Sequence, residues 1–352
     1  MRVYSAPGRV NILGNPTDGL EGAYAVISSA IDLRAYVYFG DKSPDDPFSD
    51  IDPGIARVFR GFTEVLKRYF PKIYGEFTND SPRVNVRTEI PKASGLASST
   101  ALVAAFAYGL RDLYSHSKEV NDYVLAELIT RGERTAGIEC GYADRYVSVM
   151  GGLAYMDFRG KLFHKPLFEE PFATYERLDR IVSYIPLLIV YLSIPRDSGA
   201  IHKVFRRAYL REYMLWRKGL IERSEAKILN AMKRVGLTAI EGKTALLEED
   251  WETFGKLMNI NHKWVNYAMR LAGFKDGAGY YNNAVIRFAL RKGALGAKLS
   301  GAGGGGSVLV LTEPDKEDVM KRELEGYLRE IGLKSGKVFR FKISEKGTCR
   351  IS

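Results

Sequence analysis

Cysteine and histidine are scarce in this sequence of 352 residues. The two cysteines, Cys140 and Cys349, cannot form a framework of several disulfides, and the four histidines do not join them in a closely spaced metal-binding set. The composition therefore excludes a disulfide-stabilised scaffold and suits a reducing compartment. We expect a cytoplasmic protein.

Long apolar runs and biased segments are also missing. The most apolar run, residues 185–194, is too short to cross a bilayer, and structured-looking sequence begins within residues 1–5, so we expect neither a membrane anchor nor an export signal. There is no internal repeat, heptad pattern or low-complexity tract. Apolar residues make up 46% and charged residues 27% of the chain, which is typical of a soluble folded protein.

The length is sufficient for two domains, each with its own hydrophobic core. A polar stretch that contains proline, residues 165–174, is the best candidate for a boundary. We predict an amino-terminal lobe at residues 1–168 and a carboxy-terminal lobe at residues 169–352.

Charge of one sign predominates, since the formal net charge is +10 and the isoelectric point is near 9.3. Much of the excess lies between Arg196 and Arg234, where eleven Lys and Arg residues accompany four acidic ones. A solvated helical face explains such a segment most simply. Nucleic acid and a phosphate-rich ligand are the alternatives that the charge leaves open.

Apolar periodicity outlines a chain of mixed strands and helices. A turn rich in glycine, residues 7–19, separates the first two predicted strands. Strands are predicted at residues 2–6, 36–39, 84–90, 153–158, 187–192 and 307–311. Helices are predicted at residues 55–69, 120–135 and 284–292, with long amphipathic helices up to about residue 272.

A loop of glycine and small hydroxyl residues, 91–100, lies between a predicted strand and an alanine-rich run, 101–107. The first amide groups of a helix that begins there are unpaired and lie at the positive end of the helix dipole, so the loop can bind an anion such as phosphate. The alternative is a helix without a ligand, whose N-cap is Ser98 or Ser99.

A second glycine-rich segment, residues 301–306, precedes a predicted strand and therefore does not fit the dinucleotide-binding pattern, while the P-loop pattern is absent. A tight turn is one explanation. Four consecutive glycines exceed what a hairpin requires, because each costs backbone entropy on folding. We expect a close approach of this backbone to a ligand.

Three stretches together resemble the motifs of one family. Residues 7–11 (PGRVN), 95–99 (GLASS) and 298–305 (KLSGAGGG) are similar to motifs one, two and three of the GHMP kinases, in the same order. This resemblance implies phosphorylation of a small molecule with ATP and magnesium. It also implies an α+β fold of two lobes, an amino-terminal lobe like ribosomal protein S5 domain 2 and a ferredoxin-like carboxy-terminal lobe.

The segment around Asp144 narrows the resemblance to the sugar kinases of the family. Residues 141–145 (GYADR) resemble the segment that carries their catalytic aspartate, but galactokinases have Gln where this chain has Arg145. Residues 14–18 (GNPTD) and the Asp-Ser-Gly at 197–199 are more similar to glucuronokinase. The resemblance thus favours a glucuronokinase-like sugar 1-kinase over a galactokinase.

The family resemblance assigns roles to individual residues. Asp144 acts as the base, or at least as the anion that orients the attacking hydroxyl, and Arg9 keeps it ionised. Magnesium binds Ser99 and Glu133, although Glu133 also fits an exposed helix carboxylate beside other charges. The ATP-binding residues are Lys92, Ser94, Gly95, Leu96, Ala97, Ser98, Ser99 and Thr100. The substrate-binding residues are Asn15, Asp18, Gly141, Arg145, Gly303 and Gly304.

The preferred substrate on this interpretation is a uronic acid, whose carboxylate needs a cationic partner in a closed site. Arg145 is the first candidate, and Arg196, His202 and Lys203 are others. Alternatively, Arg145 pairs with a neighbouring carboxylate of the protein.

Other functions remain open at this stage. The substrate could be another sugar, such as galactose or a heptose phosphate, or the chain could be a relative that binds sugar and ATP without reacting. An RNA-binding protein with an S5-like lobe is a rival of another class, but the sequence lacks the aromatic and basic pattern of a stacking surface. We expect no nucleic-acid partner, no membrane partner, and a monomer or homodimer.

Overall fold

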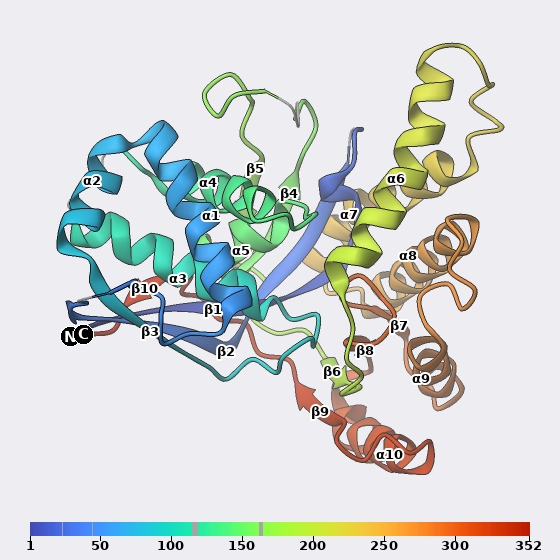
Figure 1. The fold of residues 1–352 in the computed structure, drawn as a ribbon. Helices are drawn as coiled ribbons and strands as arrows, with labels where there is room; N and C mark the ends of the chain where they lie inside the picture. The colour runs from blue at the N-terminus through green and yellow to red at the C-terminus, as the bar shows by residue number, and fades with distance from the viewer. Residues whose placement is uncertain (23, 44, 115–118, 162–164) are drawn as a thin grey trace.

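The computed structural model describes residues 1–22, 24–43, 45–114, 119–161 and 165–352 as a mixed arrangement of helices and two antiparallel sheets (Figure 1). The predicted α+β class is confirmed. The first sheet has the order β10-β1-β2-β4-β5, and β3 also pairs with β2. Its strands are β1 (Arg2–Leu13), β2 (Ala25–Lys42), β3 (Pro82–Thr88), β4 (Leu153–Asp157), β5 (Thr174–Arg177) and β10 (Cys349–Arg350).

The first strand is longer than the sequence predicts. A turn is predicted at residues 7–19, whereas β1 continues through Pro7 to Leu13 with two register shifts, one between Pro7 and Arg9 and one between Asn11 and Leu13. Pairing with β2 along this stretch, together with burial of nearly the whole strand, overrides the local turn preference of Pro and Gly. The expected glycine turn is therefore wrong up to Leu13.

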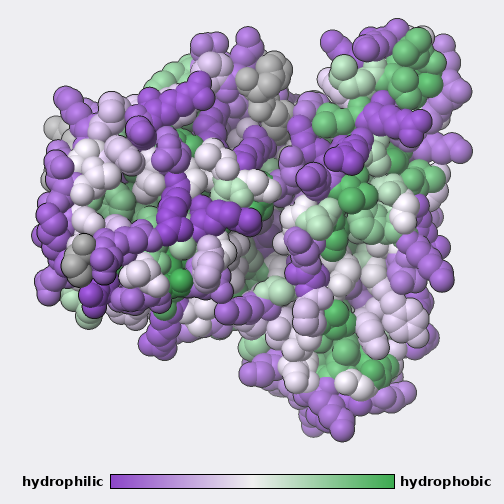
Figure 2. Space-filling view, viewed as in Figure 1, coloured by the Kyte–Doolittle hydropathy of each residue, from purple (hydrophilic) through white to green (hydrophobic). Residues whose placement is uncertain are grey.

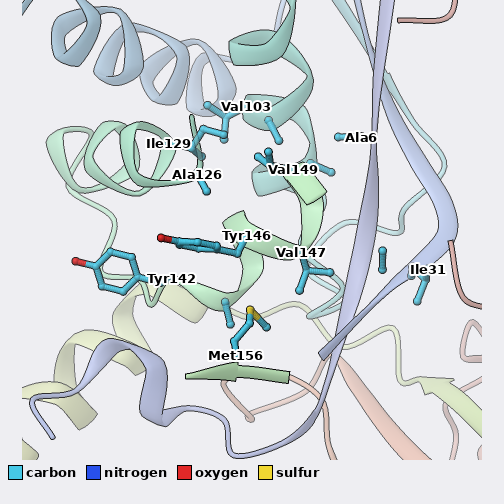
Figure 3. Packing of buried hydrophobic residues seen from close by; sticks show 14 of the residues in the cluster. Ala6, Ile31, Val103, Ala126, Ile129, Tyr142, Tyr146, Val147, Val149 and Met156 are labelled. Carbon is cyan, nitrogen blue, oxygen red and sulfur yellow. The ribbon is translucent and has the colours of Figure 1, made fainter. Parts of the chain in front are cut away.

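Five helices pack together around the core of the first lobe, with α3 and α5 against β1 and β2 (Figure 1). They are α1 (Pro53–Tyr69), α2 (Pro71–Asp80), α3 (Ser98–Leu113), α4 (Asp122–Thr135) and α5 (Ala143–Met150). The predicted helices at 55–69 and 120–135 are confirmed as α1 and α4. Figure 3 shows α5 in the core, with Tyr146 and Val149 near Ile129 and Met156. Burial of these side chains fixes the position of the amino-terminal turn of α5.

The second sheet has the order β7-β8-β6-β9. Its strands are β6 (Leu187–Tyr191), β7 (Gly296–Leu299), β8 (Ser307–Leu311) and β9 (Lys337–Arg340). Helices α9 (Tyr280–Arg291) and α10 (Glu317–Glu330) pack on this sheet. The remaining elements are α6 (Ser198–Arg217), α7 (Lys227–Leu247), α8 (Trp251–Leu271), and the short 3-10 turns η1 (Thr17–Gly19) and η2 (Pro314–Lys316).

The strand order of the first sheet indicates that the lobe boundary lies after residue 168. Strand β5 follows residue 168 but pairs with β4 in the first sheet, and β10 returns to β1 from the far end of the chain, so that the two termini lie side by side (Figure 1). Helix α7 contacts β2 and thereby joins the lobes. We therefore propose a boundary between β5 and β6 in place of residue 168, with the last strand belonging to the first lobe.

The molecular surface is hollowed between the two lobes on the face shown in Figure 2, where hydrophilic side chains cover much of both lobes. None of the helices within the described residues is both long and apolar enough to span a membrane.

Candidate active site

A cavity of about 500 Å³ lies between the lobes and brings most of the predicted site residues together. Strand β1, the loop before α3, the turn before α5 and the start of α6 all contribute to its wall. The predicted residues that line it are Arg9, Asn15, Asp18, Lys92, Ser94, Gly95, Ala97, Ser98, Ser99, Thr100, Glu133, Gly141, Asp144 and Arg145. Leu96, Gly303 and Gly304 do not line the cavity. Of the second glycine-rich segment, Gly301 and Ala302 line it instead.

The start of α3 has the geometry expected of an anion site. Helix α3 begins at Ser98 after Ala97, which has a left-handed backbone with φ 64°, and no side chain caps the first turn. The alternative in which Ser98 or Ser99 caps the helix is therefore wrong. Because Ser99 is exposed and no side chain caps the first turn, the first amide groups can bind a ligand.

Leu96 supports this loop from behind. Its side chain is buried in the core, and its carbonyl oxygen accepts a hydrogen bond of 3.0 Å from the amide of Arg9. A Cβ on Gly8 would lie 2.7 Å from the same carbonyl, so only glycine permits β1 to approach the loop this closely. Ser94 accepts a hydrogen bond of 2.8 Å at its carbonyl oxygen from the hydroxyl of Ser307, which ties the loop to the second lobe.

We expect Gly95→Val to weaken binding of an ATP analogue by about tenfold or more. Gly95 has φ 73°, which disfavours valine, and its Cβ would lie 2.4 Å from Nη2 of Arg196. Isothermal titration calorimetry measures the effect. Gly219→Val is the matched control, because Gly219 has φ 68° but open space around its Cβ position. Equal affinity of the two variants would leave the loop without a role in nucleotide binding.

Asp144 lies in the first turn of α5 and meets charges from both sides. The Nε and Nη2 atoms of Arg9 donate to its two oxygens, with Nε at 2.5 Å, and Nδ2 of Asn11 donates to Oδ1 at 3.2 Å. Nη1 of Arg145 lies 3.7 Å from Oδ2. Burial raises the pKa of Asp144, but the charge and hydrogen bonds of Arg9, aided by Arg145 and Asn11, bring that pKa well below its usual range.

This environment distinguishes the two roles that the sequence left open for Asp144. A general base works best when its pKa is near the working pH, whereas Asp144 remains an anion far below that pH. The geometry therefore favours an anion that orients a hydroxyl and offsets the charge of Arg9. Arg9 also donates a hydrogen bond of 2.5 Å to the carbonyl oxygen of Gly95, so it connects Asp144 to the loop before α3.

Glu133 and Arg145 form a buried ion pair. Nε and Nη2 of Arg145 both contact Oε2 of Glu133, and the hydroxyl of Thr100 donates to Oε1 at 3.2 Å. The side chains are 1% and 5% exposed, so Glu133 is not an exposed helix carboxylate. Arg145 has the partner that the sequence analysis gave as its alternative, a carboxylate of the protein rather than of the substrate.

This pair decides how well the predicted magnesium ligands fit. The exposed hydroxyl of Ser99 is suited to a hard cation. The carboxylate of Glu133 does not fit as it stands, because it already holds the guanidinium of Arg145. Within the described residues, no cluster of three or more His, Cys, Asp and Glu side chains is arranged around a metal position.

Asp18 and Gly141 form a cap for α5. Oδ2 of Asp18 accepts hydrogen bonds from the amides of Tyr142 and Ala143, at 2.8 and 2.9 Å. A Cβ on Gly141 would lie 2.0 Å from this oxygen, so the glycine is needed for the cap itself. The other oxygen, Oδ1, accepts no hydrogen bond from the described part of the chain and remains available to a substrate hydroxyl.

Asn15 is more occupied than the sequence suggests. Its Nδ2 donates to the carbonyl oxygen of Ser300 at 3.2 Å, and its Oδ1 accepts from Nζ of Lys298 at 2.8 Å. Lys298 is fully buried and also donates to the carbonyl oxygens of Asn11 and Leu299. Asn15 therefore joins the lobes. Only the second N–H of its Nδ2 and the second lone pair of its Oδ1 are left for the predicted role in sugar binding.

Lys298 is the first residue of motif three, and the sequence predicts no role for its side chain. Burial lowers its pKa, and the charge of Arg9 lowers it further. Its place three residues before Gly301 was the sequence signal of its importance, because its partners Asn11 and Asn15 are distant in the sequence.

Gly303 and Gly304 approach protein rather than open space. The carbonyl oxygen of Gly303 accepts a hydrogen bond of 2.5 Å from Nη1 of Arg196, and the amide of Gly304 donates to the carbonyl oxygen of Ala278 at 2.8 Å. The observed partners of this backbone are Arg196 and Ala278, and its expected close approach to a ligand stays a prediction.

Arg196 lies between the two glycine-rich segments. A Cβ on Gly95 or Gly301 would lie 2.4 or 2.8 Å from its Nη2 atom. Its Nε is buried and has no hydrogen-bond partner among the described residues. Burial, and then the charge of Arg9, lowers the pKa of Arg196 to about 10, so the side chain still carries its charge near neutral pH.

His202 lines the same cavity from α6. Burial lowers its pKa to about 4, and the charges of Arg196, Arg145 and Arg9 favour the same direction. The imidazole is therefore neutral near pH 7 and can donate or accept a hydrogen bond without pairing a negative charge.

Known proteins resemble this chain in sequence and in fold. Residues 58–152 match the family model for the GHMP kinases N terminal domain, and residues 243–330 match that for the GHMP kinases C terminal. Glucuronokinase 1 of Arabidopsis thaliana is 29% identical over 275 residues, which cover 77% of this chain and 68% of that protein. Galactokinase of Thermotoga petrophila is 24% identical over 362 residues, covering 93% and 94%. The structure of Lactococcus lactis galactokinase complexed with galactose superimposes with a TM-score of 0.76 at 17% identity, covering 99% and 95%.

Proposed function

The chain belongs to the GHMP kinase family, and from this we propose that it transfers the γ-phosphate of ATP to the anomeric hydroxyl of a uronic acid such as glucuronate. Two plant proteins named as glucuronokinase or probable glucuronokinase are among its relatives, at 29% and 28% identity. Their names support the substrate class, and the residues of the cavity support it independently.

The observation that carries the proposal is the guanidinium of Arg196. Of the four candidate partners for a substrate carboxylate, Arg145 is held by Glu133 and Lys203 lies outside the cavity lining. His202 is neutral near pH 7. Arg196 is charged, lines the cavity, and has no carboxylate within salt-bridge distance in the described parts of the chain. A uronate carboxylate would supply the anionic partner that this half-buried cation lacks.

The other cavity residues divide the remaining tasks of phosphoryl transfer, which are positioning and charge stabilisation. The amide groups at the start of α3 hold the ATP phosphates. Asp144, held by Arg9, orients the attacking hydroxyl, and Oδ1 of Asp18 accepts from another hydroxyl of the sugar. Magnesium, when bound with the nucleotide, offsets phosphate charge, and Ser99 is the side chain placed to hold it.

A screen of ADP release with matched sugars tests the substrate. We expect the kcat/KM for glucuronate to exceed that for glucose by about tenfold or more, and galacturonate to exceed galactose in the same way, since each pair differs by the carboxylate. Equal use of the acid and the neutral sugar would contradict the uronate assignment and leave a sugar kinase of another preference. Heptose phosphates belong in the same screen, because their phosphate is also an anion.

The screen also addresses the rival functions. Failure to release ADP with any of these sugars or with mevalonate would contradict a small-molecule kinase. Retention on RNA at moderate salt, with no ATP turnover, would favour the RNA-binding alternative. Cytoplasmic location and a monomer or homodimer remain part of the proposal.

A further inference from the structure

The ion pair of Glu133 and Arg145 lies in the wall of the ATP cavity, at the place where a metal ligand is expected. Oε2 of Glu133 receives two donors from Arg145, and Oε1 receives the hydroxyl of Thr100, the third residue of α3. The carboxylate is thus satisfied on both oxygens before any ligand enters. Such a buried, paired and hydrogen-bonded charge is costly to separate.

Arg145 is held in this place from its other side as well. Its Nη1 atom donates to the carbonyl oxygen of Gly141 at 3.3 Å and lies 3.7 Å from Oδ2 of Asp144. The guanidinium therefore lies between two carboxylates, and the charges alternate along the cavity wall as Arg9, Asp144, Arg145, Glu133. This row of four side chains is formally neutral. A divalent ion on Glu133 would have to displace Arg145 or lie beside it.

We propose that Arg145 is the resident cation of Glu133, so that Glu133 binds Arg145 in the working protein and does not bind the divalent ion. Ser99 is then the side chain that holds the ion on this side of the cavity. Arg145 is a positioning residue, since it fixes Glu133 and the α5 turn that carries Asp144. The inference rests on the proposed kinase function only where nucleotide is used in its test.

The first part of the test uses the full chain and Mn²⁺ alone, with free Mn²⁺ measured by electron paramagnetic resonance. Wild type is expected to bind no Mn²⁺ tightly. Arg145→Gln is expected to gain a site at least about tenfold tighter, because it leaves the charge of Glu133 unpaired beside Asp144 and affinity for hard cations follows ligand charge. Arg145→Lys, which keeps the charge, is the matched control and is expected to gain no site.

The second part adds a nonhydrolysable ATP analogue. Glu133→Gln combined with Arg145→Gln removes the pair without leaving a buried charge, so this double variant is expected to fold and to hold Mn²⁺ in the ternary complex within about threefold of wild type. Ser99→Ala is expected to weaken that Mn²⁺ by about tenfold, because it deletes an oxygen ligand. A loss of tenfold or more in the double variant would overturn the inference.

The two parts separate this inference from the proposed function. Gain of Mn²⁺ by Arg145→Gln in the absence of nucleotide supports the inference even if no sugar is phosphorylated. A wild-type protein that binds Mn²⁺ tightly by itself, and loses it in the double variant, contradicts the inference whatever the substrate. If Arg145→Gln does not fold, as a thermal melt would show, the ternary complex of the double variant decides the question.

Discussion

Replacing Asp144 by asparagine is expected to lower kcat about a hundredfold or more while leaving the affinity for ATP nearly unchanged. The variant removes the anion proposed to orient the attacking hydroxyl. It also leaves Arg9 facing a neutral amide where the wild type has a carboxylate that accepts from both Nε and Nη2. The amides at the start of α3, which we propose hold the ATP phosphates, belong to another segment and should be preserved. Steady-state kinetics and calorimetry with an ATP analogue measure the two quantities.

Glu139→Gln is the control for this variant. Glu139 also lines the cavity, but its carboxylate lies 3.7 Å from Nε of Arg206 and has no contact with Arg9. Its kcat is expected to stay within about threefold of wild type, since an exposed ion pair of this kind contributes little. A kcat for Asp144→Asn close to that of Glu139→Gln would remove Asp144 from the mechanism.

The pH profile distinguishes an orienting anion from a general base. Because the pKa of Asp144 is held below its usual range, the group stays ionised as pH falls from 8 to 5. The wild-type kcat is therefore expected to show no acidic limb from Asp144 in that range. An acidic limb with a pKa between 6 and 7 that disappears in Asp144→Asn would show a titrating base and contradict the orienting role.

The sequence predicts those parts of the site that depend on local backbone chemistry. Gly95 and the small residues after it indicate a loop followed by a helix whose first amides are free, and α3 begins at Ser98 in agreement. Likewise, the glycines at 303–306 all have positive φ, a conformation that glycine adopts more readily than other residues. A backbone conformation that few residue types adopt can be predicted from the sequence, because the residue type at that position indicates it.

Partners that are distant in the sequence could not be predicted in the same way. Lys298 and Asn15 are 283 positions apart and meet through the packing of two lobes. Glu133 and Arg145 are separated by a bend whose direction depends on the cap from Asp18. A buried charged residue needs a partner of opposite charge, but the fold determines which residue that is. The sequence therefore left two possible partners for Arg145, and the structure pairs it with Glu133.

The same reasoning makes Arg196→Gln the sharpest test of the substrate. Arg196 is charged, and within the described residues its Nε has no hydrogen-bond partner and its guanidinium has no carboxylate partner. Its Nη1 donates to the carbonyl oxygen of Gly303. A uronate carboxylate would complete its contacts with charge-assisted hydrogen bonds. Losing them is expected to cost about 1.5–3 kcal/mol, or roughly ten- to a hundredfold in kcat/KM for glucuronate.

The neutral sugar separates this role from an alternative one. Because Arg196 lies beside Gly95 of the proposed phosphate-binding loop, it could instead contact a phosphate oxygen of ATP. In that case Arg196→Gln would lower kcat/KM for glucose and glucuronate by the same factor, and the uronate proposal would lose its supporting residue. If Arg196 binds the substrate carboxylate, the variant lowers kcat/KM for glucuronate but not for glucose. The ratio of the two kcat/KM values then falls towards unity. Lys203→Gln, which removes an exposed cation of α6 outside the cavity lining, should leave the preference unchanged.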